Sequence, residues 1–335
     1  RIAVVGDFCL DRYLEIDPSK AERSIETKLP VHNVTHVRSQ PGGAGTILNN
    51  LCALGIHEII PIAFCGRDAE GHELQEALSA RKEVNLNHFL CTPERRTFTY
   101  CKPLLMHPGR APEELSRLDF KNWSPTPESV TRLLIDAAKK VISEIDAMIL
   151  LDQVDEAESG VLTSPLLHAI GDLANAHPDL PIVGDSRHGF ADWPAISYKM
   201  NESEFRRFTG AGDSAEVMDF LPQLAAHTRQ SQRPAFVTLD SAGIVSVAAD
   251  GKISHETALP THGEIDIVGA GDAVSANLSA ALAAGANPRE AAALANRAAS
   301  VVIHQLGTTG TASVEEIASL EPPIDSPIGI ARSAE

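Results

Sequence analysis

Apolar residues along the chain fall into two kinds of segment. Short continuous runs rich in β-branched side chains predict buried strands, and runs that repeat every three to four residues predict helices packed by one face. The predicted main-body strands are Ile2–Val5, Ile59–Phe64, Ala147–Leu151, Pro181–Asp185, Ser197–Met200, Ala235–Leu239, Ile244–Ala248 and Ile253–Thr257. The predicted helices are residues 44–54, Gly71–Lys82, Glu128–Glu144, Leu162–Ala176, Glu202–Phe208, Val217–His227, Ala273–Ala284 and Pro288–Gln305.

The order of these elements predicts the fold class. From residue 128 onwards, helices and strands alternate. This order is typical of βαβ units, so we expect a doubly wound α/β domain whose mostly parallel sheet is covered on both faces.

Two β-rich segments, about 13–38 and 92–119, carry strand pieces without a long helix between them. Pro30 interrupts the first of these segments, which indicates an edge or exposed strand. We therefore expect a small second β-sheet that stands off the main body as a lid. Residues 1–335 are expected to form a single domain with this lid.

Charge and cysteine content narrow the functional classes. The formal net charge is −17 and no basic run interrupts the acidic background, so nucleic acid and anionic membranes are not expected partners. No apolar run reaches the roughly 20 residues of a membrane helix. The cysteines number five and form no C-x-x-C pair, which favours free thiols in a reducing, cytoplasmic compartment over disulfides or a zinc site. The proline-rich segment after Leu320 predicts a disordered tail.

The segment with the clearest chemistry is Asp266-Ile267-Val268-Gly269-Ala270-Gly271-Asp272, directly before a predicted helix. Its small residues leave the backbone N–H groups of the helix N-terminus open, and that end favours an anion such as a transferring phosphoryl group. Asp272 is placed to accept a proton from a hydroxyl in line with the phosphorus. The alternative is an ordinary first-turn acid after a tight glycine turn, and the motif alone fits both.

At these residues the sequence resembles the ribokinase-like carbohydrate kinases, or PfkB family. The family signature D-T-x-G-A-G-D matches Asp266–Asp272, with Ile267 in place of Thr. The resemblance runs along almost the whole chain, through Gly6–Asp11, Pro41–Gly45, Gly66–Gly71, Asp185–Arg187, Asn201–Glu204, Val237–Thr238 with Gly243, Asn296, and Leu306–Thr308. The segments Gly6–Tyr13, Arg117–Phe120 and Ala295–Thr308 are most similar to the bacterial heptose-phosphate kinase branch.

The resemblance implies a kinase that uses ATP and Mg²⁺ to phosphorylate a sugar or sugar phosphate. A heptose phosphate is the first specific expectation. A nucleoside or other small-alcohol kinase is the alternative within enzymes, and a non-catalytic sensor that binds nucleotide or sugar is the alternative from another class. The resemblance also implies a monovalent cation and a homodimer formed through the lids.

The site residues follow from the same match. The catalytic set is Asp272, as base, with Gly269, Ala270 and Gly271. The expected substrate-binding residues are Asp11, Gly42, Gly43, Thr46 and Asp155. The expected cofactor-binding residues are Asp185, Arg187, Asn201, Glu204, Thr238, Gly243, Asp266 and Asn296, with Glu204 as the metal-binding residue.

Several positions depart from the family pattern. Thr46 stands where the family has an Asn that contacts the sugar, and Ile267 lacks the usual hydroxyl. Asn277 replaces a small residue, and Leu151–Asp155 replaces the D-Y-x-K-G stretch of the heptose branch. The departures lie mainly on the sugar side, so they affect the expected substrate more than the expected reaction.

Each of the other candidate residues also has a simpler interpretation. Asn201 and Glu204 have the spacing of a helix-capping pair, which competes with binding of Mg²⁺ through water. Arg187 is placed either to offset phosphate charge or to form a surface ion pair. Asp11 either orients hydroxyls beyond a strand end or is a solvated loop acid. Lys102 and Arg117 either reach a substrate phosphate or are ordinary exposed cations.

Other catalytic and nucleotide motifs are excluded by context or absence. Gly210–Ala215 fits G-x-G-x-x-A but follows a predicted helix rather than a strand, which argues against a dinucleotide site. The sequence has no G-x-x-x-x-G-K-[ST] phosphate loop and no G-x-S-x-G nucleophile motif. His72-Glu73 lacks the second His of a zinc protease motif.

Overall fold

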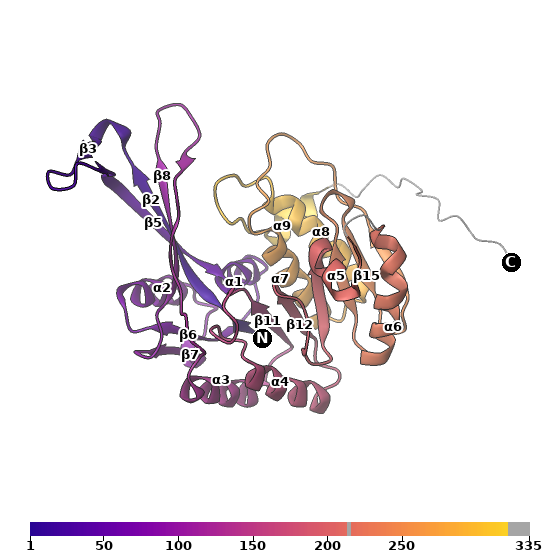
Figure 1. The fold of residues 1–335 in the computed structure, drawn as a ribbon. Coiled ribbons are helices and arrows are strands. Elements are labelled where there is room, and N and C mark those ends of the chain that lie inside the picture. Colours follow the sequence, from indigo (N-terminus) through magenta and orange to yellow (C-terminus); the bar gives the residue numbers. More distant parts are fainter. Residues whose placement is uncertain (213–215, 321–335) are drawn as a thin grey trace.

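A nine-stranded sheet forms the centre of the molecule (Figure 1) in the computed structural model, which describes residues 1–212 and 216–320. In spatial order its strands are β16 (Ile253–Glu256), β15 (Ile244–Val247), β14 (Ala235–Thr238), β13 (Ser197–Asn201), β12 (Ile182–Ser186), β11 (Ala147–Asp152), β1 (Ile2–Gly6), β6 (Ile59–Gly66) and β7 (Phe89–Thr92). The pairs from β7 to β14 are parallel, and β15 and β16 are added antiparallel. This confirms the predicted mostly parallel sheet.

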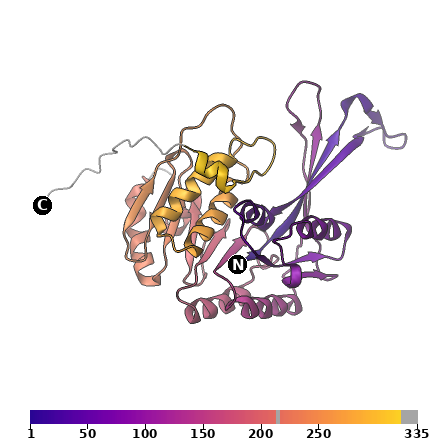
Figure 2. The same cartoon turned by 180° about the vertical axis from the view of Figure 1, so that it is seen from behind.

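Helices cover both faces of this sheet (Figures 1 and 2). They are α1 (Ala44–Ala53), α2 (Ala69–Ser79), α3 (Glu128–Val141), α4 (Ser164–Ala176), α5 (Glu202–Thr209), α6 (Leu221–Ser231), α7 (Ala270–Ala283), α8 (Pro288–Val302) and α9 (Val314–Ser319). Helix α7 packs against α1 and α8 and reaches β11 and β12, while α3 packs against α4. Because β1 and β11 are covered on both sides, their residues are buried at nearly every position.

A second sheet projects from the main body as the predicted lid (Figure 1). Its order is β10 (Leu118–Phe120), β8 (Phe98–Leu105), β2 (Phe8–Ile16) and β5 (Val34–Gly43), with β9 (Glu113–Glu114) paired to β8. Near the tip, β3 (Glu22–Arg23) and β4 (Pro30–Val31) form a separate two-stranded pair. The lid segments predicted at 13–38 and 92–119 therefore lie in this sheet, but its strands extend further into the body.

The strand registers separate the lid into two faces. Asp11 pairs with Gln40 and Tyr100, and Tyr13 pairs with Arg38 and Lys102, so these polar residues share one face. The opposite face, which we call the apolar lid face, carries Val37, Leu118 and Phe120, which are 42%, 61% and 41% exposed.

The observed elements differ from the predicted ones mainly where local signals conflict. β2 is continuous from Phe8, although the sequence analysis placed the first lid segment only from residue 13. The helix predicted at Val217–His227 is split into a 3₁₀ turn, Val217–Phe220, and α6, because Pro222 in the first turn of α6 lacks the N–H that a continuous helix requires. The short elements β7 and α9 were not predicted.

Two sequence features lie outside the described residues. They are Asp213–Ala215, the last part of the G-x-G-x-x-A match, and the proline-rich segment 321–335. Across the described parts of the chain, no helix combines the length and the apolar character needed to cross a bilayer.

Candidate active site

The glycine-containing turn before α7 forms the N-terminus of that helix. Gly269 is the N-cap and has a φ of 86°, a left-handed conformation that favours glycine. Asp266 fixes the turn because its Oδ1 accepts from Val268 N at 3.0 Å and its Oδ2 accepts from Gly307 N at 3.2 Å. Ile267 is 72% exposed, so the residue that departs from the family pattern does not support the turn from inside. The open amides are suited to hold an anion.

Asp272 lies in the first turn of α7, as predicted. Burial, followed by the nearby Asp185 carboxylate, raises the pKa of Asp272 to about 7, while Lys199 and Arg187 act in the opposite direction. A carboxyl whose pKa lies near neutral is well matched to accept a proton from a hydroxyl and release it again. Asp272 is also an acid in the first turn of a helix, so its role as the base stays a prediction.

A buried lysine, which the sequence analysis missed, lies next to the anion-binding turn. Lys199 Nζ is 2.9 Å from Asp185 Oδ2, and a Cβ at Gly271 would lie 3.3 Å from the same ammonium. Burial alone would lower the pKa of Lys199, but the attraction of Asp185 raises it overall, so the side chain stays protonated. A positive charge at this position is suited to stabilise a phosphoryl group held by the turn.

Ser275 completes this arrangement from α7. Its hydroxyl donates to Asp185 Oδ2 at 2.7 Å and lies 3.1 Å from the Gly271 carbonyl oxygen. Asp185 therefore joins β12, β13 and α7 and holds Lys199. The cofactor contact expected for Asp185 stays a prediction. Side chains alternate between the two faces along β13, so Lys199 and Asn201 lie on the same side of the strand. This shared side was the signal in the sequence that could have indicated the lysine.

Asn201 and Glu204 form a complete capping box at the start of α5. Glu204 N donates to Asn201 Oδ1 at 2.8 Å, and Asn201 N donates to Glu204 Oε2 at 2.8 Å. Burial raises the pKa of Glu204, and Asp185 adds to the increase. No cluster of metal-ligating side chains occurs in residues 1–212 and 216–320. One carboxylate that acts through water is compatible with Mg²⁺, so the metal role of Glu204 stays a prediction.

The substrate side is centred on Asp11, which is buried at the base of the lid. Burial raises the pKa of Asp11, and Lys102, whose Nζ lies 3.5 Å from Asp11 Oδ1, counteracts part of the increase. A Cβ at Gly42 would lie 2.6 Å from Asp11 Oδ2, so only glycine fits there without displacement. The structure thus brings together Asp11 and Gly42, two of the expected substrate-binding residues, with Lys102. Their binding roles stay predictions.

A second buried acid, Asp7, holds the loop after β11 near Asp11 and the lid base. Its carboxylate accepts from the backbone N–H groups of Gln153, Val154 and Val161, at 3.0, 3.2 and 2.7 Å. Burial raises its pKa to about 6 although these hydrogen bonds act against the shift. The loop after β11 is therefore fixed, and Gln153 Oε1 lies 2.6 Å from the position of a Cβ at Gly43. Gln153 is a substrate-side candidate that the sequence analysis did not select.

Some predicted residues make structural contacts instead. Thr46 is buried in the first turn of α1, and Asp155 is an exposed acid that pairs with Lys121 at 2.7 Å. On the expected nucleotide side, Thr238 Oγ1 lies 3.4 Å from the Met200 carbonyl oxygen, and Asn296 donates to the Thr257 carbonyl. Gly243 ends a 3₁₀ turn with a φ of 97°. The binding roles given to these residues stay predictions.

Arg187 follows β12 and lies close enough to lower the pKa of both Asp272 and Asp155. The cation is therefore part of the electrostatic surroundings of the site. This supports a role in offsetting phosphate charge more than the surface ion pair that the sequence left open.

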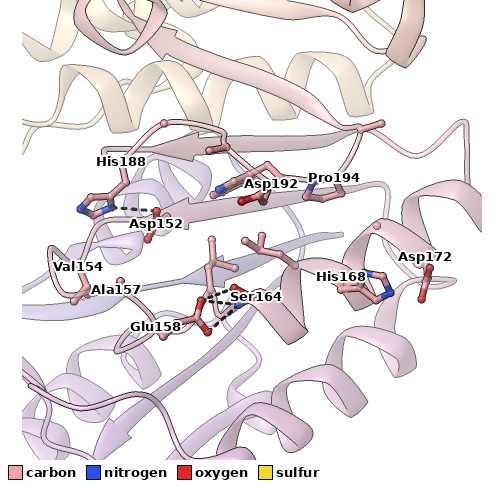
Figure 3. A pocket seen from close by; sticks show the side chains of 18 of the residues that line it. Asp152, Val154, Ala157, Glu158, Ser164, His168, Asp172, His188, Asp192 and Pro194 are labelled. Atoms are coloured by element: carbon pink, nitrogen blue, oxygen red, sulfur yellow. Dashed lines mark hydrogen bonds and ion pairs between the residues drawn. The ribbon is translucent and has the colours of Figure 1, made fainter. Parts of the chain in front are cut away.

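A cavity of about 660 Å³ lies beside this site, between α4 and the loop after β12 (Figure 3). Asp152 enters it from β11, where its Oδ2 accepts from Ser186 Oγ at 2.7 Å and lies 3.2 Å from His188 Nδ1. The wall carries Glu156, Glu158, Asp172 and Asp192 as further acids, and its described lining includes no Lys or Arg. Such a wall repels phosphates, and Asp272 does not line it, so the cavity is not the phosphoryl-transfer site.

Comparison with known proteins identifies the family. Residues 166–315 match the sequence family described as pfkB family carbohydrate kinase, and this segment contains Lys199, the α7 turn and Asp272. This part of the chain is similar to the pfkB carbohydrate kinases. The resemblance stated from the motifs is confirmed.

Two curated relatives are each named Bifunctional protein HldE. The protein of Rhodospirillum rubrum is 31% identical over 330 residues, covering 96% of this chain and 62% of the relative. That of Paramagnetospirillum magneticum is 29% identical over 316 residues, covering 92% of this chain and 60% of the relative. The chain thus spans less than two thirds of the length of these relatives.

Solved structures confirm the ribokinase-like fold. Phosphofructokinase-2 from Escherichia coli, in complex with substrates and products, superposes with a TM-score of 0.69 at 16% identity, covering 95% of this chain and 96% of that one. Arabidopsis thaliana ribokinase, complexed with ribose and ATP, gives a TM-score of 0.65 at 17% identity, covering 92% and 94%. At these identities the likeness concerns the fold.

Proposed function

We propose that this pfkB-family protein transfers the γ-phosphoryl group of ATP to a hydroxyl of a phosphorylated sugar. The observation that carries the proposal is the Asp272 carboxyl, whose pKa is raised to about 7, at the mouth of a helix N-terminus. Lys199 lies beside the same turn. A base, open amides and a fixed cation at one point are what phosphoryl transfer to a hydroxyl requires.

In this mechanism Asp11 orients the acceptor sugar at the base of the lid, and the reacting hydroxyl of the sugar points toward Asp272. Asp272 accepts the proton as the oxygen attacks the γ-phosphorus, and the bond from that phosphorus to the bridging oxygen of the β-phosphate breaks, which releases ADP. The Ala270 amide donates to the Ile267 carbonyl at 3.2 Å, so the amides of Gly269 and Gly271, with the Lys199 ammonium, stabilise the charge on the phosphoryl oxygens. Mg²⁺, held through water by Glu204 with Asn201 alongside, would neutralise charge on the ATP phosphates.

Cations on the polar side of the lid favour an acceptor that already carries a phosphate. Lys102 faces Asp11, and Arg117 stacks on Tyr100 with its guanidinium 5.0 Å from the ring centroid. Arg187 adds charge from the main body. The resemblance to the heptose-phosphate kinases and the HldE relatives makes a heptose phosphate the first acceptor to test.

The proposal also includes a cytoplasmic location and a homodimer formed through the apolar lid face. All five cysteines are free thiols, which supports a reducing compartment. Val37, Leu118 and Phe120 leave apolar surface on the lid that a second copy would cover.

The test measures ATP consumption with Mg²⁺ and K⁺ against ribose, fructose 6-phosphate, a heptose phosphate and adenosine. Acceptor-dependent turnover in the wild type, lost by at least about 100-fold in Asp272→Asn, is the expected result. The exposed acid Asp136 on α3 supplies a matched control, Asp136→Asn, which should keep full turnover. Turnover with adenosine and with none of the sugars as acceptor would identify a nucleoside kinase. Binding of ATP or sugar without turnover would favour a sensor.

A further inference from the structure

A hydrogen bond joins the lid base to the loop beside the α7 turn. Gln40 Nε2 donates to Thr309 Oγ1 at 2.7 Å, although the residues lie 269 positions apart in the sequence. Gln40 belongs to β5 at the base of the lid, and Thr309 belongs to the loop between α8 and α9. Figure 1 shows the α8–α9 region on the side of the main body that faces the lid.

The Gln40 end of the bond is part of the substrate side. Gln40 is the register partner of Asp11 in the β2–β5 pair, and Gln40 Nε2 lies 3.5 Å from the Tyr13 hydroxyl. The next residues along β5 are Pro41, Gly42 and Gly43, and Gly42 contacts Asp11 closely. A ligand bound at Asp11 and the glycines therefore restrains the strand position that carries Gln40.

The Thr309 end is part of the anion-binding turn. A Cβ at Gly269 would lie 3.3 Å from Thr309 Cβ, so the Thr309 side chain packs directly over the N-cap of α7. The same loop is tied to the turn by hydrogen bonds from Gly307 N to Asp266 Oδ2 and from Asp266 N to the Ile303 carbonyl, at 3.2 and 2.8 Å. A shift of Thr309 is therefore transmitted to Gly269.

We propose that Gln40 and Thr309 are positioning residues that couple occupancy of the sugar site to the geometry of the anion-binding turn. The inference rests on the proposed kinase function. With the bond in place, a bound sugar holds the turn in the shape that receives the ATP phosphates. Because coupling between sites is reciprocal, bound ATP also strengthens sugar binding.

The experiment measures the affinity of Mg²⁺ and AMP-PNP with and without the acceptor that gives the highest turnover in the panel above. In the wild type the acceptor tightens AMP-PNP binding. In Gln40→Leu and in Thr309→Val this enhancement falls by about three- to tenfold, the scale expected for one hydrogen bond. In Gln40→Leu, whose side chain lies outside the anion-binding turn, AMP-PNP binding alone changes less than about twofold. The double variant loses no more than either single variant, because both remove the same bond.

Two controls separate coupling from general loosening of the fold. Thr309→Ser keeps the hydroxyl and restores the enhancement. Thr35→Val removes a hydrogen bond inside the lid, from Thr35 Oγ1 to the Glu15 carbonyl, and leaves the enhancement unchanged. Thermal unfolding of each variant identifies any that is merely unstable.

The outcomes distinguish this inference from the function on which it rests. Wild-type turnover together with an undiminished enhancement in Gln40→Leu overturns the coupling role alone. The coupling role is also overturned if Thr309→Ser loses the enhancement as Thr309→Val does. It is overturned as well if the acceptor does not change the AMP-PNP affinity of the wild type. A wild type that shows no turnover with any acceptor removes both proposals.

Discussion

Asp272 shows how surroundings convert an ordinary residue type into a catalytic candidate. In the sequence it is one acid beside two glycines, and a helix cap explains it equally well. In the structure the side chain shares its surroundings with Asp185, Lys199 and Arg187, and burial together with Asp185 raises its pKa to about 7. The sequence predicted the position of this carboxyl, but the shift depends on groups from other strands that the motif does not contain.

This pKa predicts how activity depends on pH. The reaction needs the unprotonated carboxylate, so activity is full above the pKa of Asp272 and is lost as the pH falls through about 7. We expect kcat/KM for the acceptor to decrease about tenfold per pH unit below that point. The measurement is a pH profile of kcat/KM between about pH 5 and 9. A profile that stays flat down to pH 5 would rule out Asp272 as the base with this pKa.

At the scale of elements, the site depends on how β12, β13 and α7 meet. Asp185 ends β12 and holds Lys199 from β13 and Ser275 from α7. The sequence predicted all three elements, because their apolar patterns are regular. It did not predict the contact between Lys199 and the turn, because a lysine in a short strand has no local sign of burial. The capping box at α5 was foreseen only as the alternative to metal binding.

The arrangement predicts separate effects of Lys199 on activity and on stability. Lys199→Met removes the cation beside Gly271, so kcat should fall by about 10²–10³-fold. It also leaves Asp185 buried without its partner, which should reduce the free energy of unfolding by about 3–5 kcal/mol. Steady-state kinetics and urea unfolding measure the two effects.

Asp185→Asn in the Lys199→Met background separates these effects. The double variant removes the unpaired charge, so it should recover most of the lost stability while activity stays low. In Lys199→Met alone, residual activity should need a higher pH, because Lys199 lowers the pKa of Asp272. The double variant also removes Asp185, which raises that pKa by more, so this need for a higher pH should disappear. Recovery of activity along with stability would show that Lys199 acts only on the fold.

For the whole molecule, the sequence predicted the division into body and lid, but it did not predict how far the lid strands extend. Helices alternating with strands indicated the main sheet, and the two β-rich segments indicated the lid. β2 was missed as one strand because Asp11 and Arg12 interrupt its apolar pattern. The registers then show what sequence alone could not: Asp11, Tyr13, Gln40 and Lys102 share the polar face of the lid.

The apolar lid face predicts self-association. Val37→Asp combined with Leu118→Asp places charges on this face and should shift the protein from dimer to monomer. Leu133→Asp is the matched control, because Leu133 is 53% exposed on α3 and should leave the assembly unchanged. Sedimentation velocity measures the fractions of monomer and dimer in each protein. Equal dimer content in all these proteins would place the interface elsewhere.

The central claim is transfer of a phosphoryl group to a sugar hydroxyl by Asp272, and ³¹P NMR of the reaction tests it most directly. With ATP, Mg²⁺ and a heptose phosphate, the account predicts that ADP and a new phosphate ester of the sugar form in equal amounts, and that neither forms with Asp272→Asn. Release of inorganic phosphate without a sugar ester, or an unchanged rate in Asp272→Asn, would contradict the account.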